Sequence, residues 1–206
     1  MLEHAPVVVG IIGASGSGKT TLARALVAAL PADEAVILPL DAYYRDLSHL
    51  DAARRPHCNF DAPAAIDWPL FEAHLLALQQ GHGVDRPDYD FTSHTRTAGT
   101  TRLPSRPVVV TEGVLLFCRE RVRSLISTSV FLDVDDQTTV ARRLARDLRE
   151  RGRGADDVRA QLARDVLPMF ERYGRPARRW ATLTVSGTAG IAANVDRVLR
   201  ALGRER

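Results

Sequence analysis

Near its start the 206-residue sequence reads Gly13-Ala14-Ser15-Gly16-Ser17-Gly18-Lys19-Thr20, which matches the pattern G-x-x-x-x-G-K-[ST] at every position. An apolar run, residues 7–12, precedes the motif and predicts a buried strand, while the apolar spacing of residues 20–30 predicts a helix. The motif therefore stands between a strand and a helix, the context that it requires. A glycine-rich turn that binds nothing is the alternative, and a full match in this context argues against it.

The residue types of this loop suit the phosphates of a nucleotide. Glycines let successive backbone N–H groups surround the phosphates, and the positive end of the following helix faces their charge. Lys19, the only lysine of the chain, is expected to reach the β- and γ-phosphates, and the Thr20 hydroxyl to bind Mg²⁺. The predicted nucleotide-binding residues are Gly13, Ala14, Ser15, Gly16, Ser17, Gly18, Lys19, Thr20 and Thr21.

Short apolar runs alternate with helical patterns along the chain, which predicts an α/β fold with a parallel sheet flanked by helices. Five core strands are expected at residues 7–12, 36–40, 108–111, 130–134 and 183–185. Helices are expected at residues 20–30, 68–80, 137–150, 156–169 and 191–202. Asp67 and Asp136 have the positions and side chains of helix N-caps.

Two regions interrupt this alternation. Residues 41–67 are rich in Asp, Pro and aromatic residues, and residues 81–105 carry glycines and prolines around short β-like stretches. Segments of this length without a clear period are usually functional in a compact domain. We therefore expect residues 1–206 to form a single domain, with substrate-binding insertions at about 41–67 and 81–105, the second of them a hairpin.

The composition excludes several classes of protein. No segment is apolar and long enough to cross a membrane, no signal or transit peptide is expected, and two distant cysteines do not make a disulfide framework. The net charge of +3 is weak support for nucleic-acid binding, because the arginines are interspersed with acidic residues. We expect a cytoplasmic protein that binds neither nucleic acid nor membranes.

The absence of other motifs narrows the reaction. A GTPase needs an N-K-x-D segment, which a chain whose only lysine is Lys19 does not have, and the L-S-G-G-Q signature of transport ATPases is also missing. Small-molecule kinases remain. Phosphoryl transfer to a hydroxyl needs a base, a held Mg²⁺ and cations around the transferring group.

Candidates for these roles follow the predicted strands. Asp41 and Glu112 come at the carboxyl ends of the second and third strands, where open α/β sheets place their ligands. A turn-capping Asp41 and a solvated Glu112 are equally open alternatives at this point. A run of arginines that ends in Arg151-Gly152-Arg153-Gly154 predicts a closing lid over about residues 143–157, with a solvated basic helix as the alternative.

Several segments together resemble the uridine kinase and phosphoribulokinase family almost from end to end. The matching segments are Asp41-Ala42-Tyr43-Tyr44-Arg45-Asp46-Leu47, Asn59-Phe60-Asp61, Tyr89-Asp90-Phe91-Thr92-Ser93-His94-Thr95-Arg96, Thr111-Glu112-Gly113, Arg142-Arg143-Leu144-Ala145-Arg146-Asp147 and Glu150-Arg151-Gly152-Arg153. The resemblance implies the P-loop kinase fold, with a β-hairpin insertion and an arginine lid. It also implies ATP as phosphoryl donor, Mg²⁺ as cofactor and a homo-oligomer, usually a tetramer.

The resemblance also implies roles for single residues. Catalytic roles fall to Asp41 as base, Lys19, Arg146 and Arg151, and Mg²⁺ binding falls to Thr20, Glu112 and Asp41. The implied substrate-binding residues are Asp41, Tyr44, Phe60, Asp61, Tyr89, Phe91, His94, Arg143, Arg153 and Gln161. The segment Ser186-Gly187-Thr188-Ala189-Gly190 departs from the family's turn, so no adenine contact is predicted there.

These observations predict ATP-dependent phosphorylation of the 5′-hydroxyl of a pyrimidine nucleoside, uridine or cytidine. A kinase for another hydroxyl, such as that of another nucleoside or of ribulose phosphate, is the first alternative. The segment from Tyr89 to His94 argues against it. A non-catalytic nucleotide-binding regulator is the second alternative, and the complete set of Asp41, Glu112 and arginines argues against that.

Overall fold

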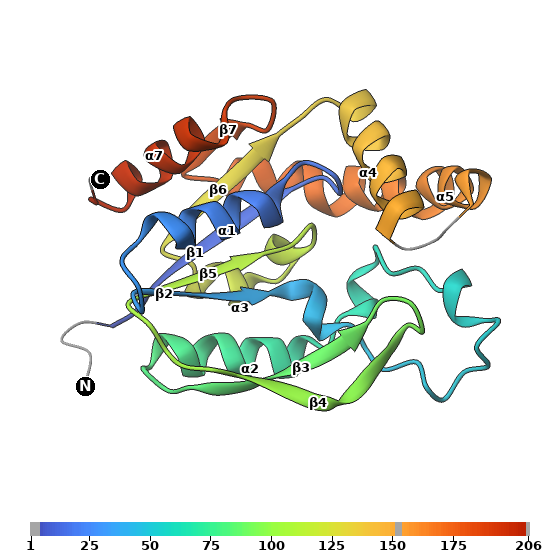
Figure 1. Ribbon diagram of the computed structural model, residues 1–206, viewed down its shortest axis with the longest axis horizontal. Helices are drawn as coiled ribbons and strands as arrows, with labels where there is room; N and C mark the ends of the chain where they lie inside the picture. The colour runs from blue at the N-terminus through green and yellow to red at the C-terminus, as the bar shows by residue number, and fades with distance from the viewer. Residues whose placement is uncertain (1–4, 151–153, 205–206) are drawn as a thin grey trace.

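The computed structural model describes residues 5–150 and 154–204. In these residues five strands form one parallel sheet in the order β2-β5-β1-β6-β7 (Figure 1). The strands are β1 (Val7–Gly13), β2 (Ala35–Pro39), β5 (Val108–Glu112), β6 (Thr128–Asp133) and β7 (Leu183–Ser186). The continuous apolar runs of β1 and β5 are buried on both faces, as parallel strands covered by helices require. The predicted fold class and the five predicted strands are confirmed.

Helices cover both faces of this sheet. On one face α1 (Lys19–Ala29) and α7 (Ile191–Ala201) pack their apolar side chains on Val9 and Ile11 of β1 and on β5, β6 and β7. On the other face α2 (Trp68–Gln79) and α3 (Glu120–Leu125) pack on Val8 and Ile12 (Figure 1). The alternation of side chains along a strand explains why neighbouring residues of β1 serve two separate apolar layers.

The second predicted insertion is a two-stranded antiparallel hairpin, β3 (Val84–Asp90) and β4 (Thr95–Leu103), which is separate from the main sheet. Its turn includes His94 with a φ of 56°, a left-handed conformation that is uncommon for a residue with a side chain. The first insertion contains short 3₁₀ turns at Leu40–Tyr43, Arg55–His57 and Pro63–Ala65. Tyr44 and Ile66 form a β-bridge that closes the base of this insertion.

The helical region after β6 is longer than predicted. Helix α4 (Asp136–Glu150) is followed by α5 (Ala155–Gln161), and the chain stays helical through α6 (Leu167–Met169) and its flanking π-helical turns to the 3₁₀ turn Arg175–Trp180. Val158, Leu162 and Val166 pack against Val140 and Leu144 of α4. The predicted lid falls partly on residues 151–153, which lie outside the described residues.

Of the two predicted helix N-caps, one is confirmed and the other is wrong. Asp67 caps α2 as predicted, because its carboxylate accepts a hydrogen bond from Leu70 N at 3.4 Å. The predicted N-cap at Asp136 is wrong: the preceding Asp135 accepts from Thr138 N at 2.8 Å, and Asp136 is the first residue of α4. Asp136 instead forms an ion pair with Arg175 at 2.9 Å.

Candidate active site

The phosphate loop joins β1 to α1 through two residues with left-handed backbone, Gly16 (φ 84°) and Gly18 (φ 100°). A Cβ on Gly16 would lie 2.6 Å from the carbonyl oxygen of Thr139 in α4, so glycine also lets this helix approach the loop closely. The first turn of α1 carries no acidic side chain that would offset its positive end. Residues 15–21 line a cleft, whereas Gly13 and Ala14 form the base of the turn.

Lys19 is buried at this loop, where its Nζ donates a hydrogen bond to the carbonyl oxygen of Ala14 at 2.9 Å. Burial lowers the pKa of its ammonium group, although the negative charges of Glu112 and Asp41 oppose this shift. A desolvated cation in the first turn of a helix, where backbone N–H groups have no carbonyl partner within the helix, favours an anionic ligand. This arrangement suits the β- and γ-phosphates of a nucleotide.

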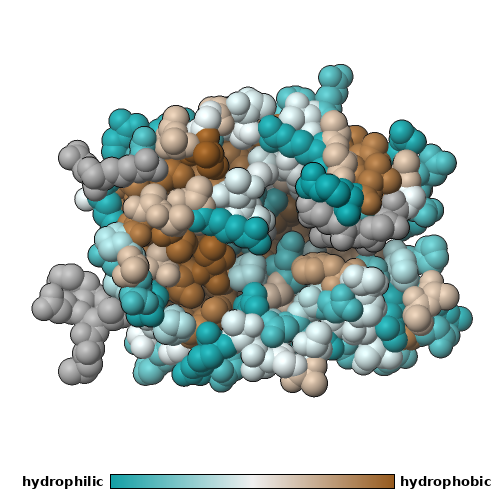
Figure 2. All heavy atoms as spheres, viewed as in Figure 1, coloured by the Kyte–Doolittle hydropathy of each residue, from teal (hydrophilic) through white to brown (hydrophobic). Residues whose placement is uncertain are grey.

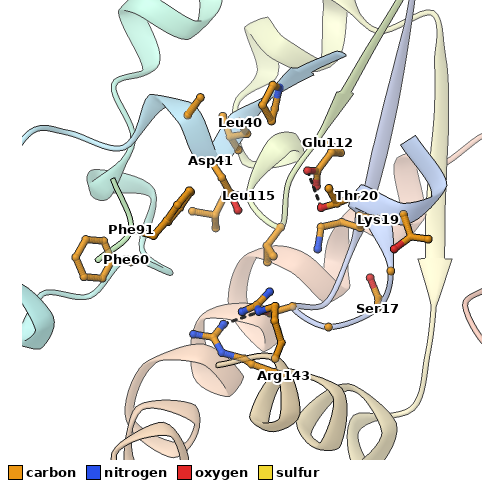
Figure 3. A pocket seen from close by; sticks show the side chains of 18 of the residues that line it. Ser17, Lys19, Thr20, Leu40, Asp41, Phe60, Phe91, Glu112, Leu115 and Arg143 are labelled. Atoms are coloured by element: carbon orange, nitrogen blue, oxygen red, sulfur yellow. Dashed lines mark hydrogen bonds between the residues drawn. The ribbon is translucent and has the colours of Figure 1, made fainter. Parts of the chain in front are cut away.

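Glu112 and Asp41 are brought to the same edge by the register of the sheet. Glu112 pairs with Ile11 of β1 and with Pro39 of β2, and Asp41 follows two residues after Pro39. Figure 3 shows Asp41 between the aromatic side chains on one side and Lys19, Thr20 and Glu112 on the other. The predicted convergence of Asp41 and Glu112 on the phosphate loop is therefore present.

The polar groups at this edge fit a Mg²⁺ ion. The Thr20 hydroxyl donates to Glu112 Oε1 at 3.0 Å. Burial raises the pKa of Glu112, and the negative charge of Asp41 raises it further. A divalent cation would relieve this repulsion. In the part of the chain that the structure describes, no cluster of three or more His, Cys, Asp or Glu side chains forms a metal cage, and Mg²⁺ usually binds with one or two carboxylates plus phosphates and water.

Five aromatic rings meet at the other end of the cleft: Tyr44, Phe60, Tyr89, Phe91 and His94. The ring centroid of Tyr44 lies 5.7 Å from that of Phe60, 5.4 Å from that of Tyr89 and 6.4 Å from that of Phe91. His94 stacks on Phe60 at 4.6 Å. The Tyr89 hydroxyl is buried and has no hydrogen-bond partner among the described residues, which leaves a donor for a ligand. These predicted substrate residues lie together, although they come from both insertions.

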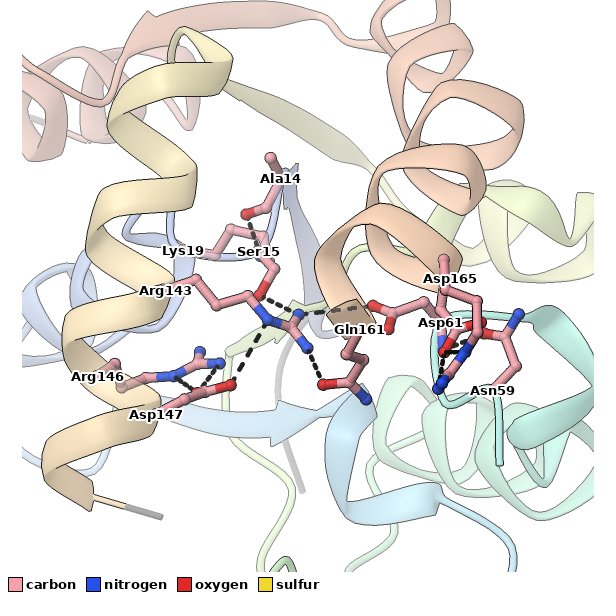
Figure 4. A network of polar contacts seen from close by, with 11 residues as sticks. Ala14, Ser15, Lys19, Asn59, Asp61, Arg143, Arg146, Asp147, Gln161 and Asp165 are labelled. Carbon is pink, nitrogen blue, oxygen red and sulfur yellow. Dashed lines mark hydrogen bonds and ion pairs between the residues drawn. The ribbon is translucent and has the colours of Figure 1, made fainter. Parts of the chain in front are cut away.

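Arg143 lies at the centre of a polar network (Figure 4). It is 6% exposed and donates to Ser15 Oγ at 2.8 Å and to Gln161 Oε1 at 3.2 Å. Its Nη1 is also 3.7 Å from Asp61 Oδ1. One guanidinium therefore contacts the phosphate loop and two of the predicted substrate residues. Arg146 lines the cleft as well, whereas the predicted site residues Arg151 and Arg153 lie outside the described residues.

The whole cleft has a volume of about 1110 Å³ and runs from the aromatic rings past Asp41 to the phosphate loop. Ligand pockets commonly measure roughly 300–1,000 Å³, so this one has room for two substrates side by side. Figure 2 shows the surface hollowed between the parts drawn at the top and the bottom of the view.

The sequence missed part of the cleft beyond the phosphate loop. Arg142, Gly187, Ala189, Ile191 and Asn194 line that end, and Arg142 donates to the carbonyl oxygen of Gly187 at 3.1 Å. Ile191 is 41% exposed and offers an apolar side chain to this end of the cleft. The arginine run contained Arg142, but no pattern paired it with the segment after β7.

The role of Arg96 was also not predicted from the sequence. Its Nε donates to the carbonyl oxygen of Tyr44 at 3.0 Å, and its Nη2 pairs with Asp67 at 3.1 Å. Its backbone N–H also bonds the Asp46 carboxylate at 3.0 Å. Arg96 thus fastens the hairpin to the first insertion, and so holds the aromatic rings of the two segments together.

Comparison with known proteins agrees with this geometry. The model of the phosphoribulokinase / uridine kinase family matches residues 8–189. The chain belongs to this family. Its similarity to uridine kinases of the family extends over nearly the whole chain. The uridine kinase of Streptococcus gordonii is 35% identical over 195 residues, which cover 95% of this chain and 93% of that protein. The uridine kinase of Chloroflexus aggregans is 37% identical over 198 residues, 96% and 95% of the two chains.

The fold of this chain is also similar to that of a solved structure with a different name. It is a candidate fructose transport system kinase from Silicibacter sp. TM1040, which superposes with a TM-score of 0.71 at 28% identity and covers 89% of this chain and 91% of that one. In this chain, no described helix combines the length and the apolar character needed to cross a membrane.

Proposed function

We propose that this protein transfers the γ-phosphoryl group of ATP to the 5′-hydroxyl of uridine and cytidine, with UMP or CMP and ADP as products. The observation that carries the proposal is the single cleft in which the aromatic rings and the phosphate loop face each other across Asp41. The similarity to uridine kinases over nearly the full length of both chains supports the same substrate class.

The donor end binds ATP through the phosphate loop. Lys19 and the loop amides hold the β- and γ-phosphates, and Thr20, Glu112 and Asp41 are the residues that would hold Mg²⁺. A Mg²⁺ ion held there would supply positive charge against the charge that develops on the phosphates during transfer. Ile191 and Arg142 line the far end of the cleft, and we assign this end to the adenine base.

The acceptor end orients the nucleoside. We assign Asp61 to the ribose hydroxyls and Tyr89 and Phe91, which line the same end of the cleft, to the pyrimidine ring, and we expect purine nucleosides to be excluded. His94 bonds the base edge, because an imidazole both donates and accepts and so serves uracil and cytosine alike. Asp41, between this pocket and the phosphate loop, orients the 5′-hydroxyl and accepts its proton.

Arginines complete the site around the transferring group. Arg146 lines the cleft together with Lys19, and its charge adds to the effect of burial, which lowers the pKa of that ammonium. We assign Arg146 and Arg151 to the transferring phosphoryl group and Arg143, Arg153 and Gln161 to the nucleoside. The assignments of Arg151 and Arg153 rest on the family resemblance alone.

We also propose a cytoplasmic homo-oligomer, a tetramer as is usual in the family, that acts on small molecules without nucleic acid or membranes. Cys58 and Cys118 are free thiols, which suits a reducing compartment. Light scattering on the purified protein tests the oligomer, and a monomer at micromolar concentration would exclude the tetramer.

An assay of ADP release tests the proposed reaction across five acceptors: uridine, cytidine, adenosine, guanosine and ribulose 5-phosphate. We expect turnover with the two pyrimidine nucleosides only. Preference for a purine nucleoside or the sugar phosphate would favour a kinase for another acceptor on this scaffold. ATP binding without turnover of any acceptor would favour a nucleotide-binding regulator.

A further inference from the structure

Asp147 is a buried carboxylate that the proposed reaction does not use directly. It lies on α4 with no exposed surface. Its Oδ1 accepts a hydrogen bond from Arg146 Nε at 2.9 Å and forms an ion pair with Arg146 Nη2 at 2.8 Å. Two nitrogens of one rigid guanidinium therefore contact the same carboxylate oxygen, which restricts the orientation of the Arg146 side chain.

The second oxygen of Asp147 faces the other arginine of the site. Asp147 Oδ2 is 3.6 Å from Arg143 Nε, one turn earlier on the same helix. Arg143 in turn reaches Ser15 in the phosphate loop and Asp61 at the acceptor end. A continuous series of contacts therefore runs from Arg146 through Asp147 and Arg143 to both halves of the cleft (Figure 4).

The charges explain why an acid stands at this position. Arg143 and Arg146 are three residues apart on a helix, so their side chains are neighbours and their like charges repel. A buried carboxylate costs free energy unless it is paired, and here it is paired with both cations. Without it, the two guanidinium groups would move apart, and Arg146 would lose the contact that fixes its orientation in the cleft.

We propose that Asp147 is a positioning residue, which holds Arg146 oriented toward the transferring phosphoryl group and couples it to Arg143 at the acceptor side. The proposal rests in part on the proposed function, because it assumes that Arg146 contacts that group. Its effect should fall on kcat more than on KM for ATP, since Lys19 Nζ is held by the carbonyl oxygen of Ala14, whereas Asp147 reaches the phosphate loop indirectly, through Arg143 and Ser15.

The test compares Asp147→Asn with Glu72→Gln as a matched control. Glu72 is also a buried carboxylate that pairs with two arginines, Arg119 at 3.3 Å and Arg121 at 3.8 Å, but none of the three lines the cleft. Asp147→Asn is expected to lower kcat by about 10- to 100-fold with KM for ATP changed less than about threefold, and Glu72→Gln to leave both constants unchanged. Equal effects of the two variants on kcat would overturn the proposal.

A double-mutant cycle with Arg146→Ala tests whether Asp147 acts through Arg146. In that background Asp147→Asn is expected to change kcat by less than about threefold, because the group that it positions is already gone. If the two losses in kcat instead multiply, Asp147 acts by another route and the proposal is wrong.

A measurement on the ligand-free wild-type protein is independent of turnover and of whether Asp147→Asn folds. The Arg146 Nε–H signal, assigned by its loss in Arg146→Lys, should exchange slowly with water in NMR spectra, and the two Nη groups should give separate signals. Rapid exchange and averaged Nη signals would overturn the proposal. If the wild type phosphorylates no nucleoside, the proposed function fails, and this measurement still decides on the contact.

Discussion

The imidazole of His94 lies nearly parallel to the ring of Phe60, with centroids 4.6 Å apart and planes inclined by 19°. Phe60 belongs to the first insertion and His94 to the turn of the hairpin, so this stack joins the two segments that form the acceptor end of the cleft. The stack on Phe60 restricts the plane of the imidazole. The left-handed backbone at His94 determines the direction in which the side chain leaves the turn. Both constraints prepare His94 to meet one edge of a planar base.

His94→Ala is expected to lower kcat/KM for uridine and cytidine and to change their ratio. A lost buried hydrogen bond costs on the order of 1–3 kcal/mol, or about 5- to 150-fold in kcat/KM. Steady-state kinetics with both nucleosides measures the effect. Phe60→Leu is the companion variant: it keeps His94 but removes the stack, and it should give a smaller loss of the same kind. Equal and small losses for both nucleosides in His94→Ala would contradict the assignment of the base edge.

Asp41→Asn is expected to lower kcat by at least about 10²-fold, the usual scale of a lost general base. Asn keeps the size of the side chain but does not accept a proton from the 5′-hydroxyl. Rapid-quench measurement of the chemical step shows the effect directly, and equilibrium binding of nucleoside serves as the control for folding. A kcat equal to that of the wild type would place the base elsewhere.

Glu112→Gln is expected to raise the Mg²⁺ concentration needed for half-maximal rate by about tenfold or more, because a neutral amide replaces a hard anionic ligand. Titration of the initial rate with MgCl₂ at constant ATP measures this shift. Chelation by EDTA should abolish turnover in the wild type, and added Mg²⁺ should restore it. An unchanged Mg²⁺ requirement in Glu112→Gln would remove this residue from the metal site.

Asp61→Asn is expected to stabilise the fold at neutral pH while raising KM for nucleoside. Burial raises the pKa of Asp61 in the folded protein, and Arg143 only partly opposes this shift. A carboxyl with a raised pKa contributes its full stability below the unfolded pKa of about 4 and loses it as the pH rises through the folded value. The ionised group is therefore a net cost at neutral pH.

Calorimetry from neutral pH down to about pH 4 checks this expectation. The Tm of Asp61→Asn should exceed that of the wild type at neutral pH, and the difference should shrink as the pH falls and Asp61 of the wild type takes up its proton. A lower Tm for the variant at neutral pH would mean that the pair with Arg143 outweighs the cost of burial.

The sequence predicted those features that depend on short, local patterns. The phosphate loop and the strands β1 and β5 follow from contiguous residues, and Asp41 and Glu112 follow from their places at strand ends. The six residues of α3 are too few for a helical period to emerge. Asp135 and Asp136 are adjacent acids, and only the folded backbone decides which of them caps α4.

Contacts between segments that are distant in the chain could not be predicted from the sequence. The bond between Arg143 and Ser15 joins residues 128 positions apart, and Arg96 meets Tyr44 across 52. The sequence placed Arg143, Arg146 and Asp147 in one motif. It did not show that the Asp147 carboxylate lies between the guanidinium groups of the two arginines. That relation depends on how α4 packs on the phosphate loop, which no local period encodes.

The identity of the product tests the central claim most directly. Incubation of the protein with ATP, Mg²⁺ and uridine, followed by ³¹P–¹H correlation NMR of the purified product, locates the new phosphate on the ribose. The account predicts that the phosphorus couples to the two 5′-methylene protons, as in 5′-UMP, and that 5′-deoxyuridine yields no product. Phosphate on the 2′- or 3′-hydroxyl, or turnover of 5′-deoxyuridine, would contradict the placement of Asp41 between the acceptor pocket and the phosphate loop.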